Sequence, residues 1–428
     1  MARPAATASQ TGLSLRAYMA ASHGLTVIAP YLLRRRVERG KEDTDRMGEN
    51  LGFATQARPT GRLIWMHAVG LGEVLALRGL INAMAGEDPA ASYLVTSTAR
   101  SSAQVMAANL PARTQHQFLP LDAPPYVARF LDHWRPDLSI WAEQEVWPRA
   151  VVMASARGIP VAMVNARLTD ASTRRRLRVR GLYADLFARM SLIAAQDAPS
   201  AARLQALGAP DVRVAGAFKL AAPPLSCDAT ELANLRQALA GRSVWVAAST
   251  HAGDEAEAIA AQTRLFGQDA RRLLILVPRD PGRAPDIGLA LSSAGLSHVL
   301  RSAGQKPGAS EAVWIADSYG ELGLWYRLAG AALIGGGFDA IGGHNPWEAA
   351  ALGAAILHGP DTSNFSGDYA LLHQADAARQ VGPGALGDAL LADDLPRMAL
   401  RAAQIVESSQ QALGPLARDL LALMRRAT

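Results

Sequence analysis

The sequence predicts an α/β protein with two Rossmann-like domains that face a central cleft, preceded by an N-terminal membrane-associated helix. Short apolar runs alternate with helical patterns along most of the chain, which is the rhythm of parallel sheets covered by helices. A proline-rich break at 221–226 interrupts this rhythm, which then restarts. An apolar stretch with a basic exit precedes the first run.

Residues 1–50 form the expected N-terminal segment. The apolar stretch at 13–33 is interrupted by Arg16 and Pro30, and it runs into the arginines at 34–36. Because a spanning helix needs about 20 apolar residues, we expect an interfacial anchor beside anionic headgroups. The alternative is a helix packed on the protein's own body. If the segment meets a membrane, its basic exit favours a cytoplasmic catalytic body.

The two stretches of alternating pattern predict one domain at 51–222 and a second at 223–428. The expected strands lie at 63–66, 93–95, 138–141, 161–164, 192–195, 244–248, 273–277, 313–316, 331–334 and 355–357. The segment at 390–424 has helical spacing, and we expect it to return and cover one domain.

Composition narrows the classes of partner. The 43 basic and 38 acidic residues give a net charge of +5, which suits anionic surfaces or phosphorylated substrates. Basic residues are not interleaved with aromatic ones, so we expect no nucleic-acid partner. Cys227 is the single cysteine, which excludes internal disulfides and cysteine-based zinc sites. The histidines lack metal-ligand spacing, so we expect no metal.

Ligand-facing loops are expected where the parallel strands end at their carboxyl edge. In the first domain, a glycine-containing loop after the strand at 63–66 places Glu73 at the start of a helix. The helix dipole and local N–H groups keep such a carboxylate ionised. This position suits a general base and equally suits a capping residue.

The second domain carries four polar loops at the same kind of position. Its candidate residues are Ser249, Thr250, His251, Pro278, Arg279, Tyr319, Gly320, Glu321, Asn345, Pro346, Trp347 and Glu348. Arg279 offers a bidentate fork to phosphate, and Glu348, in an expected helix at 348–352, offers paired oxygens to a ribose diol. The alternative for each loop is an ordinary turn or a capped helix start.

Taken in order, these loops resemble the 3-deoxy-D-manno-octulosonic acid (Kdo) transferases of lipid A assembly, which are GT-B glycosyltransferases. The resemblance covers nearly the whole chain. Its matching segments are 67–73, 143–148, 165–168, 216–219, 249–251, 278–279, 317–321, 342–348, 359–360 and 364–365. So many ordered matches are far more specific than a single glycine loop.

The resemblance implies inverting transfer of Kdo from CMP-Kdo to a lipid A precursor of the lipid IVA type, at the cytoplasmic side of the inner membrane. It implies no cofactor besides this donor substrate. Glu73 corresponds to the family's catalytic glutamate, a general base. The implied CMP pocket comprises Pro278, Arg279, Tyr319, Gly320, Glu321, Asn345, Pro346, Trp347 and Glu348. Further implied substrate contacts are Arg167, Lys219, Ser249, Thr250 and His251.

Four positions depart from the family's usual residues. Gly70 stands in place of serine, Gln144 of threonine, Ala217 of asparagine and Asp280 of histidine. A negative charge at Asp280 is expected to offset Arg279 in part. The alternatives that remain are another GT-B glycosyltransferase acting on a lipid acceptor, or a non-catalytic binder of nucleotides or glycolipids.

Overall fold

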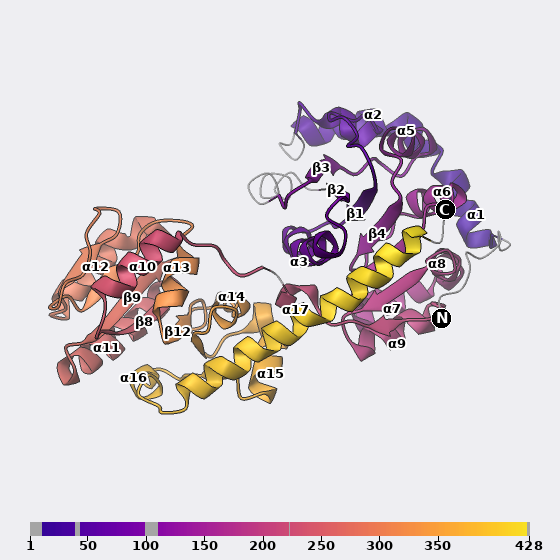
Figure 1. Cartoon of the computed structure of the whole chain (residues 1–428). Coiled ribbons are helices and arrows are strands. Elements are labelled where there is room, and N and C mark those ends of the chain that lie inside the picture. The colour runs from indigo at the N-terminus through magenta and orange to yellow at the C-terminus, as the bar shows by residue number, and fades with distance from the viewer. Residues whose placement is uncertain (1–10, 39–42, 99–109, 222, 426–428) are drawn as a thin grey trace. The chain divides into compact units, whose positions relative to one another are not determined.

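The computed structural model describes residues 11–38, 43–98, 110–221 and 223–425. Their contacts divide the chain into two compact units. The first unit comprises the described residues up to Pro223 together with those from Ser409 onward, and the second comprises Pro224–Ser408. Each unit is built around a seven-stranded parallel sheet with helices packed against it (Figure 1). The predicted α/β class, with two Rossmann-like units, is confirmed.

The first sheet has the order β3 (Thr114–Phe118), β2 (Ser92–Ser97), β1 (Leu63–His67), β4 (Leu138–Ala142), β5 (Val161–Ala166), β6 (Leu192–Ala195) and β7 (Arg213–Val214). Successive side chains of β1 serve opposite faces of this sheet. Ile64 and Met66 belong to the core that includes α3, and Leu63 and Trp65 belong to the core on the other face. Both faces are therefore buried, which explains the continuous apolar runs.

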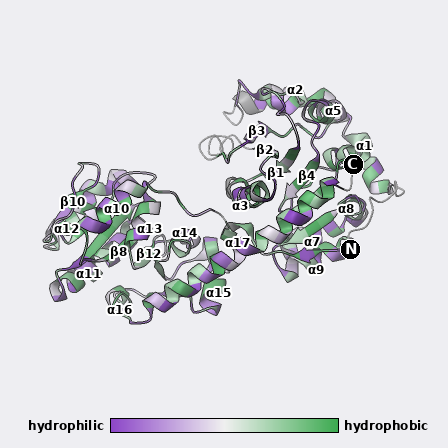
Figure 2. Cartoon of the chain, in the orientation of Figure 1, coloured by the Kyte–Doolittle hydropathy of each residue, from purple (hydrophilic) through white to green (hydrophobic). Residues whose placement is uncertain are grey.

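The helices of the first unit are α1 (Leu13–Ala21), α2 (Gly24–Glu38), η1 (Met47–Leu51), α3 (Leu71–Glu87), α5 (Pro124–Trp134), α6 (Pro148–Ala156), α7 (Asp170–Leu177), α8 (Arg180–Phe187), α9 (Ala198–Ala206) and η2 (Phe218–Ala221). Apolar residues of α5, α6 and α8 cover one face of the sheet, and those of α3 cover the other. Figure 2 shows the strands as mainly apolar and the helices as mixed.

The second sheet has the order β10 (His298–Leu300), β11 (Val313–Ile315), β9 (Arg272–Pro278), β8 (Ser243–Thr250), β12 (Ala331–Ile334), β13 (Ala355–His358) and β14 (Ala378–Gln380). Its helices are α10 (Ala229–Ala238), α11 (Ala252–Gln268), η3 (Pro281–Arg283), α12 (Ala284–Ser293), α13 (Leu322–Leu328), α14 (Trp347–Ala350), η4 (Ser363–Phe365), α15 (Ser366–Gln374), α16 (Leu386–Ala389) and the first part of α17 (Leu395–Arg425).

All ten strands predicted from the sequence are present, to within three residues at either end. The structure adds β3, β7, β10 and β14, which the sequence did not reveal. These four strands are the two edges of each sheet.

The long helix α17 matches the helical segment expected at 390–424. It begins in the second unit, where Met398 and Ala399 join the core. Its later residues Leu413, Leu416 and Leu420 lie in the core of the first unit, in the cluster that contains α3.

The helices α1 and α2 pack on the first unit, which is the alternative that the sequence left open. Leu15 of α1 is fully buried, and the Tyr18 hydroxyl donates a hydrogen bond of 2.7 Å to Asp122. Tyr126 donates to the Thr26 carbonyl of α2 at 2.9 Å. Within the described ranges, no helix combines the length and apolarity needed to cross a bilayer.

Asp122 fixes α1 to the body, because this carboxylate is 1% exposed and also accepts the backbone N–H groups of Arg149 and Ala150 at 2.8 and 2.9 Å. We predict that Asp122→Ala lowers the free energy of unfolding by at least about 2 kcal/mol, because three buried donors lose their acceptor. Chemical denaturation followed by circular dichroism measures this change.

The matched control is Asp132→Ala, which removes an exposed carboxylate paired with Arg157. This variant should lose no more than about 1 kcal/mol. Equal losses in the two variants would contradict the anchoring role of Asp122.

Candidate functional site

Glu73 lies in the first turn of α3, after the carboxyl end of β1. Its Oε2 accepts the backbone N–H groups of Val69 at 3.0 Å and Gly70 at 3.2 Å. Glu73 therefore caps the helix, which is one of the two roles that the sequence allowed. Within the described residues, the hydrogen bonds to this carboxylate all go to Oε2. Oε1 is thus the oxygen that can accept a proton from another molecule.

Two residues at the ends of neighbouring strands adopt a left-handed backbone. Glu143 has φ 60° just after β4, and Asn165 has φ 54° within β5. Such conformations cost about 1–3 kcal/mol in a non-glycine residue and cluster at functional sites. The Asn165 amide donates to Glu143 Oε1 at 3.4 Å, and its oxygen accepts the N–H of Phe218 at 3.0 Å. Asn165 therefore joins β4, β5 and η2 at the carboxyl edge of the sheet.

The predicted substrate residues of the first unit lie around this junction in sequence. Arg167 directly follows β5 and is exposed. Lys219 lies in η2, next to Phe218, and its side chain lies outside the described part of the structure.

In the second unit, the ends of β8 and β9 are tied together. The Arg279 N–H donates to the Thr250 carbonyl at 3.0 Å. Pro278 is buried as the last residue of β9, and Arg279 is exposed. Ser249 has φ 56°, a third left-handed residue at a strand end. The structure thus brings predicted residues of two loops together.

Close backbone contacts explain the glycines after β12. A Cβ atom on Gly335 would lie 2.3 Å from the Ser249 carbonyl oxygen, and one on Gly359 would lie 2.4 Å from the Gly337 carbonyl carbon. Real Cβ atoms do not approach that closely, so these positions require glycine. The ends of β8, β12 and β13 can therefore meet backbone to backbone.

The buried carboxylate of Asp254 holds this junction in place. Its Oδ2 accepts the N–H groups of His251 at 2.9 Å and Gly336 at 2.6 Å, and its Oδ1 accepts that of Phe338 at 3.2 Å. Asp254 therefore connects the start of α11 to the glycine loop after β12. The His251 and His344 rings stack beside this loop, with 3.0 Å between their Nε2 atoms.

Glu348 lies in the first turn of α14, and Asn345 and Trp347 order its loop. The Asn345 amide donates to Glu348 Oε1 at 3.3 Å, and its oxygen accepts the Trp347 N–H at 3.1 Å. Burial raises the pKa of Glu348, although the Asn345 hydrogen bond and the charge of Arg279 oppose the rise. Arg279 and Glu348 therefore interact electrostatically within the second unit.

The helix expected at 348–352 is shorter than the sequence suggested. It spans Trp347–Ala350, and the chain then turns through Gly353, whose φ is 81°. A left-handed glycine ends a helix, and β13 begins two residues later. With only four residues, α14 contributes little helix dipole to a ligand.

Among the predicted CMP residues, Glu321 has a carboxylate that is engaged in ion pairs and hydrogen bonds within the protein. Its carboxylate pairs with Arg301 at 2.7 Å, and Arg301 also pairs with Glu231 at 2.9 Å. Burial raises the pKa of Glu321, but the hydrogen bonds from Arg301 and Ser318 outweigh it and hold the pKa below its usual value. Glu321 thus anchors the turn at Gly320, where φ is 87°, beside the exposed Tyr319.

Two of the departures from the family's usual residues have local roles. Asp280 accepts the N–H of Gly282 at 2.9 Å and caps η3. Gln144 accepts hydrogen bonds from the Ser172 hydroxyl at 3.0 Å and from Arg176 at 3.2 Å. Both side chains therefore have structural partners.

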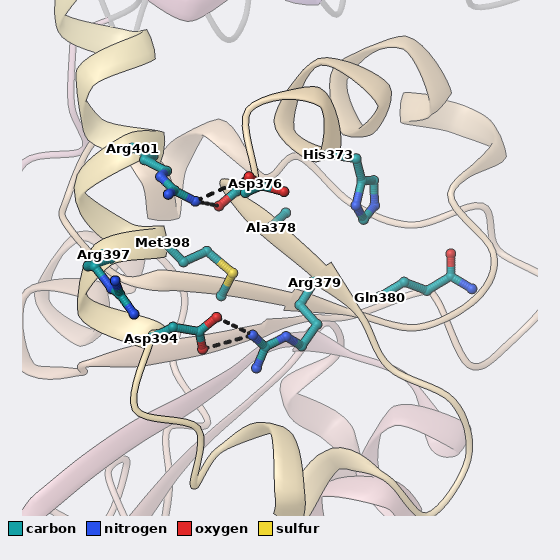
Figure 3. A pocket seen from close by; sticks show the side chains of 9 residues that line it. All are labelled: His373, Asp376, Ala378, Arg379, Gln380, Asp394, Arg397, Met398 and Arg401. Atoms are coloured by element: carbon teal, nitrogen blue, oxygen red, sulfur yellow. Dashed lines mark hydrogen bonds and ion pairs between the residues drawn. The ribbon is translucent and has the colours of Figure 1, made fainter.

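A cavity of about 640 Å³ lies elsewhere on the second unit (Figure 3). It is lined by His373, Asp376, Ala378, Arg379, Gln380, Asp394, Arg397, Met398 and Arg401. Two of its arginines pair with its own carboxylates, Arg379 with Asp394 at 2.7 Å and Arg401 with Asp376 at 3.4 Å. None of the lining residues belongs to the candidate donor loops, so this cavity is a separate feature of the second unit. Sequence reasoning predicted none of these residues.

The described ranges contain no group of three or more histidine, cysteine, aspartate or glutamate side chains placed to hold a metal ion.

Comparisons with known proteins place the chain in a family. Residues 45–222 match the family model of the 3-deoxy-D-manno-octulosonic-acid transferases (kdotransferases). A probable mitochondrial 3-deoxy-D-manno-octulosonic acid transferase of Arabidopsis thaliana is 33% identical, over 86% of this chain and 83% of that protein. The 3-deoxy-D-manno-octulosonic acid transferase of Rickettsia felis is 33% identical, over 81% and 77%. The chain belongs to this transferase family.

Membership of the Kdo transferases makes the chain a glycosyltransferase. The fold has a wider distribution. The UDP-GlcNAc 2-epimerase of Neisseria meningitidis, solved with UDP-GlcNAc, is 12% identical over 85% of this chain and 99% of its own, with a TM-score of 0.53. At that identity the likeness concerns the fold alone.

Sequence reasoning did not identify Asp254 and His344 as parts of one arrangement. Asp254 was visible only as a helix-start residue, since a carboxylate in a first turn normally caps its own helix. Asp254 also accepts hydrogen bonds from Gly336 and Phe338, which lie 82 and 84 positions later in the sequence. These contacts depend on the pairing of β8 with β12, which brings the segments together.

We predict that Asp254→Asn lowers the free energy of unfolding of the second unit by about 1–3 kcal/mol. An amide has one acceptor oxygen and an NH₂ group that would face N–H donors, so bonds to the glycine loop are lost. Asp339→Asn is the control, because among the described residues the Asp339 carboxylate accepts one N–H group, that of Gly253, and an amide oxygen can replace it. Equal losses of the free energy of unfolding in the two variants would contradict this role of Asp254.

Proposed function

We propose that the chain transfers Kdo from CMP-Kdo to a hydroxyl of a lipid A precursor, with inversion at the anomeric carbon. Family membership supports the reaction class, and the observation that carries the mechanism is the carboxylate of Glu73. Two backbone N–H groups hold its Oε2, which fixes the orientation of the carboxylate. An acceptor alcohol must lose a proton as it attacks, and Glu73 Oε1 is the group that takes this proton.

The donor's nucleotide binds, in this proposal, at the loops of the second unit. Arg279 contributes the charge for the phosphate, because it is exposed directly after β9. Glu348 accepts hydrogen bonds from the ribose hydroxyls, for which burial and the Asn345 contact hold it in position. Tyr319 and Gly320 form an accessible turn, and Glu321 positions that turn through Arg301.

The breaking bond joins the anomeric carbon of Kdo to the phosphate oxygen of CMP. Its electron pair moves to the phosphate, so the leaving group gains negative charge and needs electrostatic support. Arg279 supplies part of that support. In the first unit, Arg167 and Lys219 are the proposed partners of the Kdo carboxylate.

The lipid acceptor implies work at a membrane surface, on the cytoplasmic side of the inner membrane. The outer face of α2 suits this, because Val27 is 82% exposed and Tyr31 is 58% exposed. Arg34 and Arg35 follow on the same helix and are exposed. Apolar residues beside arginines are the pattern of helices that lie in the headgroup region of anionic bilayers.

We predict that Glu73→Gln lowers the rate of Kdo transfer by about 10²–10⁴-fold, because an amide cannot accept the proton. The assay follows transfer from freshly generated CMP-Kdo to a tetraacylated lipid A precursor, with product mass resolved. Glu87→Gln is the matched control at the other end of α3, where the carboxylate is exposed and pairs with Arg418. It should retain activity.

Full activity of Glu73→Gln would show that Glu73 is not the general base. A folded wild-type protein that binds CMP and yields no product would favour another sugar donor or a binding protein.

We predict that Val27→Glu weakens binding to vesicles that contain anionic phospholipid, by about tenfold in the partition coefficient. The reason is that a charge replaces an apolar side chain that the proposal buries in the headgroup region. Co-sedimentation with vesicles measures the change. Leu289→Glu is the control, since Leu289 is 70% exposed on α12 of the second unit. Equal binding by wild type and Val27→Glu would overturn the role of α2.

A further inference from the structure

The second unit contains a pair of imidazoles that have no role in the proposed reaction. His251 precedes α11, and His344 follows the glycine loop after β12. Their rings stack with 5.2 Å between centroids, and their Nε2 atoms are 3.0 Å apart. Both side chains are half-buried, so a ligand can reach them.

The main chain around the two rings is fixed. Asp254 Oδ2 accepts the N–H of His251, and the His344 N–H donates to the Gly335 carbonyl at 3.1 Å. The Tyr369 hydroxyl donates to the His344 carbonyl at 3.2 Å. A Cβ atom on Gly336 would lie 3.3 Å from His344 Nε2, so the ring lies against bare backbone. The pair is therefore held in place by three separate parts of the second unit, namely α11, the glycine loop after β12 and α15.

The Nε2 contact fixes where the protons of the pair lie. At 3.0 Å one nitrogen donates and the other accepts, so a single proton lies between the rings. A further proton goes to Nδ1 of the donating ring, because its Nε2 already carries one. The cationic pair therefore keeps the contact between the rings and has an added Nδ1–H group that needs an acceptor.

Charged groups on the surrounding elements act in the same direction. Burial, the neighbouring His251 and the charge of Arg279 after β9 lower the pKa of His344, and Asp254 of α11 opposes them. Asp339, after β12, is engaged by the Gly253 N–H. Burial raises the pKa of the half-buried Glu348 of α14. Together these groups favour the neutral form of His344, and an anion beside Arg279 would favour a proton on the pair.

We infer that the His251–His344 pair binds the phosphate of the donor nucleotide and takes up one proton when that phosphate arrives. This inference rests on the proposed function and extends it to two residues of the same site. The phosphate oxygens accept the Nδ1–H group that the added proton creates. The pair and Arg279 then present two positive charges to the group that leaves.

The step balances without a further reactant. One proton comes from solvent when the donor binds. As the bond from the anomeric carbon to oxygen breaks, its electron pair goes to the phosphate of CMP, and the acceptor oxygen forms the new bond to that carbon. The acceptor's proton goes to Glu73. The imidazole proton stays in its hydrogen bond to the phosphate and is released to solvent when CMP departs.

Calorimetric titration of the full chain with CMP tests this inference. At pH 7.5 the phosphate of CMP is already a dianion, since such groups have a second pKa of about 6. The dependence of the observed heat on the ionisation enthalpy of the buffer gives the number of protons taken up. We expect about one proton for wild type, and close to none for His344→Gln or His251→Gln, since an amide can donate but cannot be protonated.

The sign of the pH dependence follows from the same linkage. Anion binding raises the pKa of the pair, so CMP affinity is highest below the pKa of the ligand-free pair and is lost as the pH rises from that value through the raised one. Wild-type affinity should fall by up to tenfold per pH unit in that window, and the two variants should show a flatter profile. Cytidine, which lacks the phosphate, should bind without proton uptake.

The chain offers a matched control in a second imidazole pair. His358 and His373 also have their Nε2 atoms in contact, at 2.9 Å, but His373 lines the cavity of Figure 3 rather than the donor loops. Burial lowers the pKa of His358 to about 4, and its Nδ1–H donates to the Gly359 carbonyl at 2.8 Å. His373→Gln should take up the same number of protons as wild type.

The outcomes separate this inference from the proposed function. CMP binding by wild type without proton uptake overturns the inference alone, and this measurement stands even if a variant does not fold. Proton uptake that persists in both His344→Gln and His251→Gln also overturns it. A wild-type protein that binds no CMP overturns the donor site and the inference together.

Discussion

Burial of both faces of a parallel sheet is the constraint on which the rest of this structure depends. Helices cover each face, so the side chains of the interior strands are buried and mainly apolar. Trp245 and Ala247 of β8 show the pattern, since both are buried in the core that contains α11 and α12. The chemistry is therefore displaced to the carboxyl ends of the strands, where backbone groups and side chains meet solvent.

At these strand ends the backbone itself is part of the site. Gly335 and Gly359 allow three strand ends to touch without side chains between them. Asp254 then fixes the loops by accepting three N–H groups from two segments. Because its oxygens are used in this way, Asp254 organises the loops around it, and the half-buried histidines beside it remain the groups that can exchange protons.

Glu73 shows how a structural contact can use one oxygen of a carboxylate. Capping the helix uses Oε2, and the proposed acceptance of a proton falls to Oε1. Glu321 shows the opposite case, in which Arg301 and Ser318 engage the carboxylate. The resemblance gives Glu73 as a general base and Glu321 as part of the CMP pocket, and the hydrogen bonds of the two carboxylates differ accordingly.

The sequence by itself determined the ten interior strands, the long C-terminal helix and the loops that carry Glu73, Arg279 and Glu348. Interior strands are legible because burial on both faces demands uninterrupted apolar residues. The edge strands escaped notice because they are short or contain polar residues, as in β3, where Gln115 and Gln117 interrupt the apolar pattern and Gln117 is buried against the Trp134 indole N–H. Only the tertiary structure paired His251 with His344, 93 positions apart, since hydrogen bonds between strand ends depend on sheet order rather than on local pattern.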